Sequence, residues 1–374
     1  MRAAEKKIRV MVADDSAFMR RVLRELISSD PQMEVVGEAR DGREAVALAG
    51  SLQPDVVTMD IKMPHLDGLG AIELIMSQNP RPIVIVSSES REGAASTLRG
   101  LELGAIDFVP KPTSGIDLDM NSVRDDLTRK LRLASKVRVV RTATRSALPA
   151  SAAPSAAPAH RHEAVARPSS LPSAGNGHFP IVVLAASTGG PSTLMRLVPR
   201  FGKDFPGAVI AVLHMPATFT GQFSLQLAEN AALRVKEAES SEALQPGTLY
   251  ICPGSHHLRV TPFGRIALDD GPRISGYRPC ADVTMETVAA YAGAMTVGVV
   301  LTGMGNDGSR GAQAVKKANG LVIAEAESTA VIFGMPAEAI KTGAVEQILP
   351  LEEIYSAIEK RVLKLSRLAP VTVR

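Results

Sequence analysis

The sequence predicts an α/β protein built from two parallel-sheet domains. Its 374 residues are enough for two domains that each bury a core. In both halves, short β-rich runs alternate with amphipathic helical runs, which is typical of parallel α/β sheets. An Ala-, Pro- and Ser-rich run over residues 146–177 lies between the halves, and its composition is typical of a linker. We therefore expect domains over residues 5–130 and 178–374, joined by a linker over residues 131–177.

The composition excludes several classes of protein. Net charge is only +3, aromatic residues make up 3%, and tryptophan is absent, so nothing favours nucleic-acid binding. The two cysteines, Cys252 and Cys280, are too few for a disulfide framework and indicate buried thiols in a reducing compartment. No apolar stretch is long enough for membrane insertion, and the N-terminus does not resemble a signal peptide. We expect a cytoplasmic protein.

The first half contains five β/α units in succession. Helical patterns such as SAFMRRVLRELISS (16–29) and EGAASTLRGLELGA (92–105) lie between the strand candidates. The expected strands are IRVMVA (8–13), MEVVGEA (33–39), DVVTMD (55–60), PIVIVSS (82–88) and DFVPKP (107–112).

The second half has a similar alternation, which predicts a doubly wound, mainly parallel sheet. Two further runs, HHLRVTP (256–262) and GRIALDD (264–270), are close enough to form an antiparallel hairpin attached to that sheet. The expected parallel strands include PIVVLAA (180–186), AVIAVLH (208–214), TLYICPG (248–254), VGVVLTG (297–303) and GLVIAEA (320–326).

Polar groups follow the expected strands of the first half. Asp14 and Asp15 end the first strand, Asp60 the third, Ser87 the fourth and Lys111 the fifth. Carboxyl ends of parallel strands share one edge, where converging carboxylates favour a hard cation such as Mg²⁺. A carboxylate there could accept a phosphoryl group, with a lysine offsetting the added charge and a hydroxyl bonding its oxygens. The simpler alternative is that each acid caps a helix.

The first half resembles the response-regulator receiver domain, a flavodoxin-like (βα)5 fold. The matching stretches are VADDSAFMRR, DVVTMDIKMPHLDG, IVSSES and DFVPKP. The resemblance implies that Asp60 is the phosphoacceptor and that Asp14, Asp15 and Asp60 hold Mg²⁺. It also implies that Ser87 and Phe108 form the switch pair beside Lys111, although Phe108 as an ordinary core residue remains an alternative.

The stretch VLAASTGGP (183–191) places a serine on a glycine-rich bend after a strand. Its glycines do not have the dinucleotide-binding spacing, and Pro191 stands where a phosphate loop needs lysine. It does not match G-x-S-x-G either. Ser187 is therefore either a nucleophile or a helix N-cap, and this stretch alone does not decide between them.

A base and an acid for Ser187 can be sought at the neighbouring strand ends. His214 is the histidine that ends a strong hydrophobic strand in this half, with a buried structural histidine as the alternative. Asp307 lies in the glycine-rich run LTGMGNDGSRG, where it could also be a helix cap. Serine, histidine and aspartate at three strand ends are compatible with a catalytic triad.

Together, AASTGGP, VLHMP and LTGMGNDG resemble the chemotaxis protein-glutamate methylesterase, a response regulator with the same receiver–linker–output layout. YICPGSHHL, the GYRPCADV loop and AEAESTAVIFGMP extend the resemblance. It implies hydrolysis of glutamate methyl esters, and deamidation of certain glutamines, on methyl-accepting chemoreceptors. A chemotaxis histidine kinase would be the phosphodonor, and the ester chemistry needs no cofactor.

The resemblance also implies residue roles. Ser187 attacks the ester, His214 transfers the proton and Asp307 orients the imidazole. We place His257 near the substrate groove without a catalytic role. The expected oxyanion and supporting positions are Met304, Gly305, Thr188 and Gly189.

Regulation follows from this layout. A receiver packed over the site would block a bulky substrate, and phosphorylation of Asp60 would open it. Residues 178–374 alone should then be more active than the unphosphorylated full chain. A phosphorylation-dependent binding protein with an inactive α/β half is the main rival. A nucleotide-binding output lacks the glycine spacing, and a transcription factor lacks a helix-turn-helix.

Overall fold

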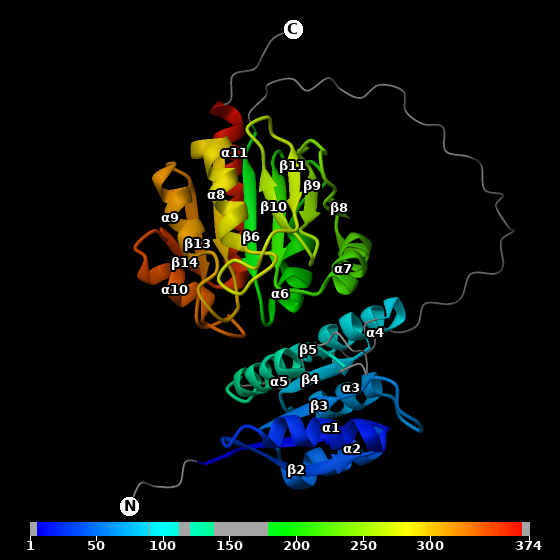
Figure 1. The fold of residues 1–374 in the computed structure, drawn as a ribbon. Coiled ribbons are helices and arrows are strands. Elements are labelled where there is room, and N and C mark those ends of the chain that lie inside the picture. Colours follow the sequence, from blue (N-terminus) through cyan, green and yellow to red (C-terminus); the bar gives the residue numbers. More distant parts are fainter. Residues whose placement is uncertain (1–5, 89, 112–119, 138–178, 369–374) are drawn as a thin grey trace, which may run out of the picture.

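The structure is a computed structural model that describes residues 6–88, 90–111, 120–137 and 179–368. It contains two α/β domains, one formed by each half of the chain (Figure 1). Most of the expected linker, residues 138–177, lies outside the described residues. The last helix of the first domain ends at Ala134, so it extends past residue 130, where we expected that domain to end.

The first domain is a five-stranded parallel sheet in the order β2-β1-β3-β4-β5. All five expected strands form. Side chains of Ser16, Asp41, Asp67 and Ser90 cap four of the helices, each accepting a hydrogen bond from a first-turn amide. The strands are β1 (Ile8–Ala13), β2 (Met33–Ala39), β3 (Val56–Met59), β4 (Ile83–Ser87) and β5 (Asp107–Pro110); the helices are α1 (Ala17–Ser28), α2 (Gly42–Leu52), α3 (Gly68–Gln78), α4 (Arg91–Glu102) and α5 (Met120–Ala134).

The second domain is a seven-stranded parallel sheet in the order β14-β13-β12-β6-β7-β9-β8. The five expected parallel strands form, and two short edge strands, β8 and β14, were not among those we named. The strands are β6 (Ile181–Ala186), β7 (Ala208–Leu213), β8 (Arg234–Glu237), β9 (Thr248–Ile251), β12 (Thr296–Val300), β13 (Leu321–Glu325) and β14 (Gln347–Leu349).

Helices cover both faces of this sheet because its central strands are apolar on both sides. In β6, Val182 and Leu184 point to the face covered by α6, α7 and α11, while Ile181 and Val183 point to the face covered by α8, α9 and α10. This is the doubly wound arrangement that we predicted. The helices are α6 (Gly190–Leu197), α7 (Ala217–Asn230), α8 (Ala281–Ala292), α9 (Ser309–Lys317), α10 (Met335–Lys341) and α11 (Leu351–Leu368), with short 3₁₀ turns η1 (Val198–Arg200) and η2 (Gly293–Met295).

The predicted hairpin is present, but it does not join the parallel sheet. Strands β10 (His257–Val260) and β11 (Ile266–Asp269) pair antiparallel as a separate two-stranded sheet. Leu258 and Ile266 bury their side chains in the same core as Met285 of α8, so packing rather than strand pairing holds the hairpin. The short apolar alternation of the hairpin predicts the strands but does not specify what they pack against.

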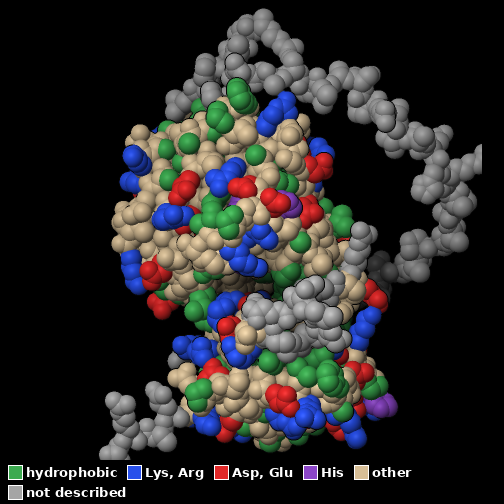
Figure 2. All heavy atoms as spheres, in the orientation of Figure 1, with side chains coloured by type: hydrophobic (Ala, Val, Ile, Leu, Met, Phe, Trp, Pro, Cys, Tyr) green, Lys and Arg blue, Asp and Glu red, His purple; other side chains and the backbone are tan. Residues whose placement is uncertain are grey.

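The two domains are in contact where α4 of the first domain packs against α6 and α7 of the second, and where Phe108 of β5 packs against Phe219 of α7 (Figure 1). Glu102 at the end of α4 accepts a hydrogen bond from Gln226 of α7. On the face drawn in Figure 2, basic and acidic side chains are interspersed over both domains, as the small net charge suggests. No helix among the described residues combines the length and the apolar character needed to cross a membrane.

Candidate active site and phosphorylation site

The strand ends of the first domain bring the predicted acidic groups together. Ligand oxygens of Asp14, Asp15 and Asp60 all lie within 4.8 Å of one another. Lys111 Nζ lies 2.9 Å from Asp14 Oδ2 and 2.8 Å from Asp60 Oδ2. The helix-capping alternative is not realised for Asp60, because Asp67 caps the following helix. A donor set of three carboxylates fits Mg²⁺, which prefers hard oxygen ligands.

A cavity of about 220 Å³ opens beside this cluster. It is lined in part by Asp15, Asp60, Ser87 and Lys111, so the predicted phosphoacceptor and its neighbours face one space. Burial raises the pKa of Asp60, although the hydrogen bond and charge of Lys111 oppose this shift. Burial acts to lower the pKa of Lys111, but Asp14 and Asp60 outweigh it and the pKa is raised. The lysine therefore remains a cation beside both carboxylates.

Ser87 and Phe108 lie on the adjacent strands β4 and β5. The Ser87 hydroxyl is buried and donates to the carbonyl of Gly93, 3.3 Å away. Phe108 is also buried, and Lys130 Nζ donates a 2.6 Å hydrogen bond to its carbonyl. The Phe108 side chain is not confined to the first domain, because its ring contacts Phe219 on α7 of the second.

In the second domain the structure brings Ser187, His214 and Asp307 into one chain of hydrogen bonds. Nδ1 of His214 lies 3.1 Å from Ser187 Oγ, and Nε2 lies 2.7 Å from Asp307 Oδ2. A carboxylate can only accept, so Nε2 carries the proton and Nδ1 is the acceptor facing the serine. The three residues follow or lie just beyond β6, β7 and β12, which are neighbours in the sheet.

Local hydrogen bonds hold Ser187 in place. Its amide donates to the carbonyl of Thr302, 3.0 Å away, and its carbonyl accepts from Gly190 N at 2.7 Å. The N-cap of α6 is Gly189, at φ +78°, and no side chain caps this helix. Ser187 therefore does not cap this helix, and its hydroxyl instead contacts His214 Nδ1.

The carboxylate of Asp307 is held by the N-terminus of α8. Its Oδ2 accepts from Ala281 N at 2.7 Å, and its Oδ1 accepts from Asp282 N at 2.9 Å and from Cys280 Sγ at 3.1 Å. Burial acts to raise the pKa of Asp307, but His214 and these amides outweigh it, so the pKa lies below its usual value. Burial and Asp307 raise the pKa of the Cys280 thiol to about 12, which keeps it protonated as a donor.

The expected oxyanion positions belong to two segments, the bend that directly follows Ser187 and the residues that follow Gly303, which is a close neighbour of Ser187. Gly303 packs so closely that an added Cβ would crowd Ser187, and Met304 and Gly305 follow it, the latter at φ +95°. Met304 is exposed. Thr188 is buried, and its hydroxyl has no hydrogen-bond partner among the described residues. Because Gly190 already donates to Ser187, the amides of Thr188 and Gly189 are the better candidates in this stretch.

Tyr277 is a neighbour of the site that the sequence analysis missed. Its ring stacks on the imidazole of His214, with centroids 4.2 Å apart and planes 13° apart. The GYRPCADV motif contains it, but no periodicity indicated where that loop would run. His257, which we placed near the substrate groove, is buried, with Nε2 3.1 Å from the carbonyl of Pro272.

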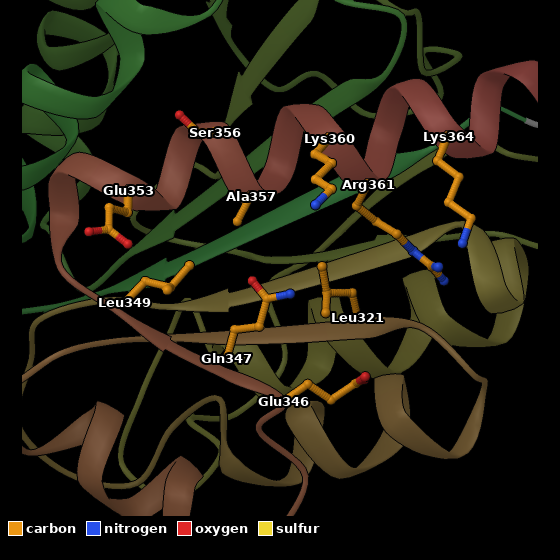
Figure 3. A pocket seen from close by; sticks show the side chains of 10 residues that line it. All are labelled: Leu321, Glu346, Gln347, Leu349, Glu353, Ser356, Ala357, Lys360, Arg361 and Lys364. Carbon is orange, nitrogen blue, oxygen red and sulfur yellow. The ribbon is translucent and has the colours of Figure 1, made fainter.

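A larger groove lies away from these residues. Its volume is about 510 Å³, and it runs between α11 and strands β13 and β14 (Figure 3). Basic side chains of α11 stand along one side, and a glutamate from before β14 stands opposite (Figure 3). None of the predicted site residues lines this groove, so cavity size does not identify the candidate active site in this protein. The lining residues are Leu321, Glu346, Gln347, Leu349, Glu353, Ser356, Ala357, Lys360, Arg361 and Lys364.

Comparison with known proteins matches each half of the chain to a protein family. The model of the CheB methylesterase family matches residues 182–358, and that of the response regulator receiver domain matches residues 10–121. The chain is 44% identical over 361 residues to the protein-glutamate methylesterase/protein-glutamine glutaminase of Symbiobacterium thermophilum, covering 96% of this chain and 98% of the relative. This chain belongs to the CheB methylesterase family. A Pyrococcus horikoshii member is 42% identical over 362 residues, covering 96% of this chain and 94% of the relative.

Membership of the CheB family confirms the predicted architecture of a receiver domain followed by a methylesterase domain. The receiver matches the five-stranded parallel sheet, and the CheB model matches the sheet that carries Ser187, His214 and Asp307. CheB relatives match along nearly their whole length, so the match includes the order of the two domains.

Proposed function

We propose that this CheB-family chain is a phosphorylation-activated serine esterase that hydrolyses glutamate methyl esters and deamidates specific glutamines on methyl-accepting chemoreceptors. The observation that carries the proposal is the placement of His214 between Ser187 Oγ at 3.1 Å and Asp307 Oδ2 at 2.7 Å. This geometry matches a nucleophile, a base and an orienting acid.

Acylation would begin at Ser187. His214 Nδ1 takes the hydroxyl proton as Oγ attacks the ester carbonyl, and the Nε2–H bond to Asp307 stabilises the resulting imidazolium. The tetrahedral intermediate collapses when the C–O bond to the methoxy group breaks and Nδ1 returns its proton to the leaving methanol. A glutaminyl amide would follow the same course, with ammonia as the leaving group.

Deacylation would use the same base for water. His214 Nδ1 takes a proton from a water that attacks the glutamyl–serine ester, and it then returns that proton to Ser187 Oγ. The receptor glutamate leaves as a free carboxylate. In both steps the negative oxygen would be bonded by backbone amides near Met304 and Gly305 and by those of Thr188 and Gly189.

The receiver domain would control access to this site. Phe108 packs on Phe219, and Val331, which packs against the receiver core, also lies against Gly189 beside Ser187. These contacts would obstruct the approach of a chemoreceptor helix to Ser187. Phosphorylation of Asp60 by a chemotaxis histidine kinase would favour an arrangement in which these contacts are broken.

Asp14, Asp15 and Asp60 would hold the Mg²⁺ that receiver domains use. When bound, the ion offsets negative charge between these carboxylates and the incoming phosphoryl group. Asp60 Oδ would accept the phosphoryl group, and Lys111, already 2.8 Å from Asp60, would pair with it. The Ser87 hydroxyl lines the same cavity and would bond a phosphoryl oxygen.

Methanol release from methylated chemoreceptor membranes tests the proposal. We expect the wild-type chain to release methanol, and a small phosphodonor with Mg²⁺ to accelerate the release. Ser187→Ala should lower turnover by orders of magnitude while leaving the fold intact. Near-normal release by Ser187→Ala would exclude the serine mechanism, and no release by a folded, phosphorylated wild type on membranes that a known CheB enzyme demethylates would favour the binding-protein alternative.

A further inference from the structure

The ring of Tyr277 lies flat against the imidazole of His214. The planes are 13° from parallel and the centroids are 4.2 Å apart, so the contact is face to face. Tyr277 is half-buried in the loop between β11 and α8. This contact adds a third restraint on His214, besides its hydrogen bonds to Ser187 and Asp307.

The segment from Tyr277 to Asp282 contacts three parts of the site. Its first residue covers the imidazole, and its last three contribute Cys280 Sγ and two backbone amides to the Asp307 carboxylate. The hydroxyl of Tyr277 lies over Gly305, where an added Cβ would overlap it. One short segment therefore packs on the base, the acid and the expected oxyanion loop.

The loop that carries Tyr277 is itself held in place. Tyr277 and Ile274 exchange two backbone hydrogen bonds of 2.9 Å and 3.0 Å. The guanidinium of Arg278 donates to the carbonyls of Asp270 at 2.6 Å and Gly271 at 2.9 Å. The ring is thus presented to His214 from a fixed backbone.

A ring at this position has two physical effects on the imidazole. Both of His214's hydrogen bonds lie in its ring plane, so rotation about Cβ–Cγ would break both of them at once. A flat neighbour restricts that rotation. The face of an aromatic ring also attracts a cation, and the imidazole becomes a cation when it takes the proton of Ser187.

We propose that Tyr277 is a positioning residue for the ester hydrolysis, and that its ring, rather than its hydroxyl, keeps His214 aligned between Ser187 and Asp307. The inference rests on the proposed function, since it takes Ser187 as the nucleophile and His214 as its base. Tyr277 acts through His214 and transfers no proton itself. Its loss should lower kcat more than it raises KM.

The test compares Tyr277→Phe with Tyr277→Leu and Tyr277→Met in the full chain, with a small phosphodonor and Mg²⁺ present. A fluorophosphonate probe reports on Ser187 without a receptor: Oγ bonds to phosphorus, the P–F bond breaks, fluoride leaves and His214 takes the proton. We expect Tyr277→Phe to label within about twofold of wild type and the two aliphatic variants about tenfold more slowly. Methanol release should show the same order in kcat.

Tyr355→Leu is the matched control. Tyr355 packs edge-on against Phe201 on the far side of the sheet, so its loss should lower the Tm and leave Ser187 labelling unchanged. A proton spectrum adds a readout of alignment: the low-field signal of the His214 Nε2–H bond to Asp307 should persist in Tyr277→Phe and broaden or vanish in Tyr277→Leu.

Three results would overturn the inference. Wild-type labelling rates in both aliphatic variants would show that the ring is not needed, while leaving the proposed function intact. Equal decreases in the Ser187 labelling rate of Tyr277→Phe and Tyr277→Leu would assign the effect to the hydroxyl instead of the ring. If the folded wild type were not labelled, Ser187 would not be the nucleophile, and the proposed function would be contradicted as well.

Discussion

The rings of Phe108 and Phe219 pack against each other across the boundary between the two domains. Their centroids are 4.3 Å apart, their planes are tilted by 32°, and both residues are buried. Phe108 belongs to β5, the strand that leads to Lys111, and Phe219 belongs to the first turn of α7, shortly after His214. This aromatic contact thus connects the strand beside the proposed phosphorylation site to the segment that follows His214, the proposed base.

Replacing Phe219 by a smaller side chain should weaken the contact between the receiver domain and the second domain. Aromatic pairs contribute about 1 kcal/mol beyond their buried area, so Phe219→Leu should shift the closed-to-open balance roughly fivefold. We expect higher methanol release without a phosphodonor and a smaller stimulation by it. Phe201→Leu is the control, because Phe201 is equally buried but contacts Phe205 and Tyr355 instead. A rise in unstimulated activity in both variants would assign the effect to general loosening.

Removing the proposed phosphoacceptor or chelating Mg²⁺ should abolish the stimulation of esterase activity by a phosphodonor. Asp60 carries the carboxylate that faces Lys111 and the 220 Å³ cavity, so Asp60→Asn should remove the response to a phosphodonor. Chelating Mg²⁺ should do the same to the wild type. Mass spectrometry of phosphate incorporation into the protein checks the Asp60→Asn variant and the chelated wild type. Full stimulation of Asp60→Asn would place the phosphoryl group on another residue.

A methyl group at Gly305 should disturb the candidate site by displacing Tyr277. Gly305 has φ +95°, which side chains rarely adopt, and its added Cβ would overlap the hydroxyl of Tyr277. Gly305→Ala should therefore lower kcat by about tenfold or more, because the proposed oxyanion segment and the stacked ring would both move. The double variant with Tyr277→Phe removes the overlapping oxygen and should lose less than the sum of the single effects. If the effects of the two single variants on kcat were strictly additive in the double variant, Gly305 would act through its backbone alone.

Glu325 should make stability depend on pH. It is fully buried at the end of β13, where it accepts from Thr302 N at 2.8 Å and from Thr329 Oγ1 at 3.0 Å. Burial raises its pKa, so between the unfolded and folded pKa values the folded state binds more protons and the free energy of unfolding falls as pH rises. Glu325→Gln removes this charge.

We therefore expect Glu325→Gln to have a higher Tm than the wild type at pH 7–8, and the two Tm values to approach each other near pH 4. Melting curves across this pH range provide the measurement. Thr329→Val, which removes a hydroxyl donor without touching the charge, serves as a comparison. An advantage of Glu325→Gln that grows toward low pH would reverse the assigned sign.

Much of the candidate site could be predicted because one rule of parallel sheets governs it. Ser187, His214 and Asp307 lie far apart in the sequence, but β6, β7 and β12 are neighbours and their carboxyl ends share an edge. The same rule brought Asp14, Asp60 and Lys111 together in the receiver. Apolar runs give strand positions directly, so the order of elements followed with little ambiguity.

Contacts made by irregular segments could not be predicted in this way. Tyr277 and Cys280 come from a loop without periodicity, and its path depends on the bonds of Arg278 and Ile274. The separate hairpin and the contact of Phe108 with Phe219 depend on packing between elements distant in sequence. Such packing is not encoded in local patterns of hydrophobic and polar residues.

The support of Asp307 by the first turn of α8 has a consequence for how this protein can change during evolution. Three of the donors to its carboxylate are backbone amides, from Ala281, Asp282 and Gly308, and a backbone amide survives almost any substitution except proline. The side chains of this turn can therefore drift without loss of the acid's orientation, provided the helix still starts at the same place. Insertions and deletions before Ala281 should be tolerated far less than replacements within the turn.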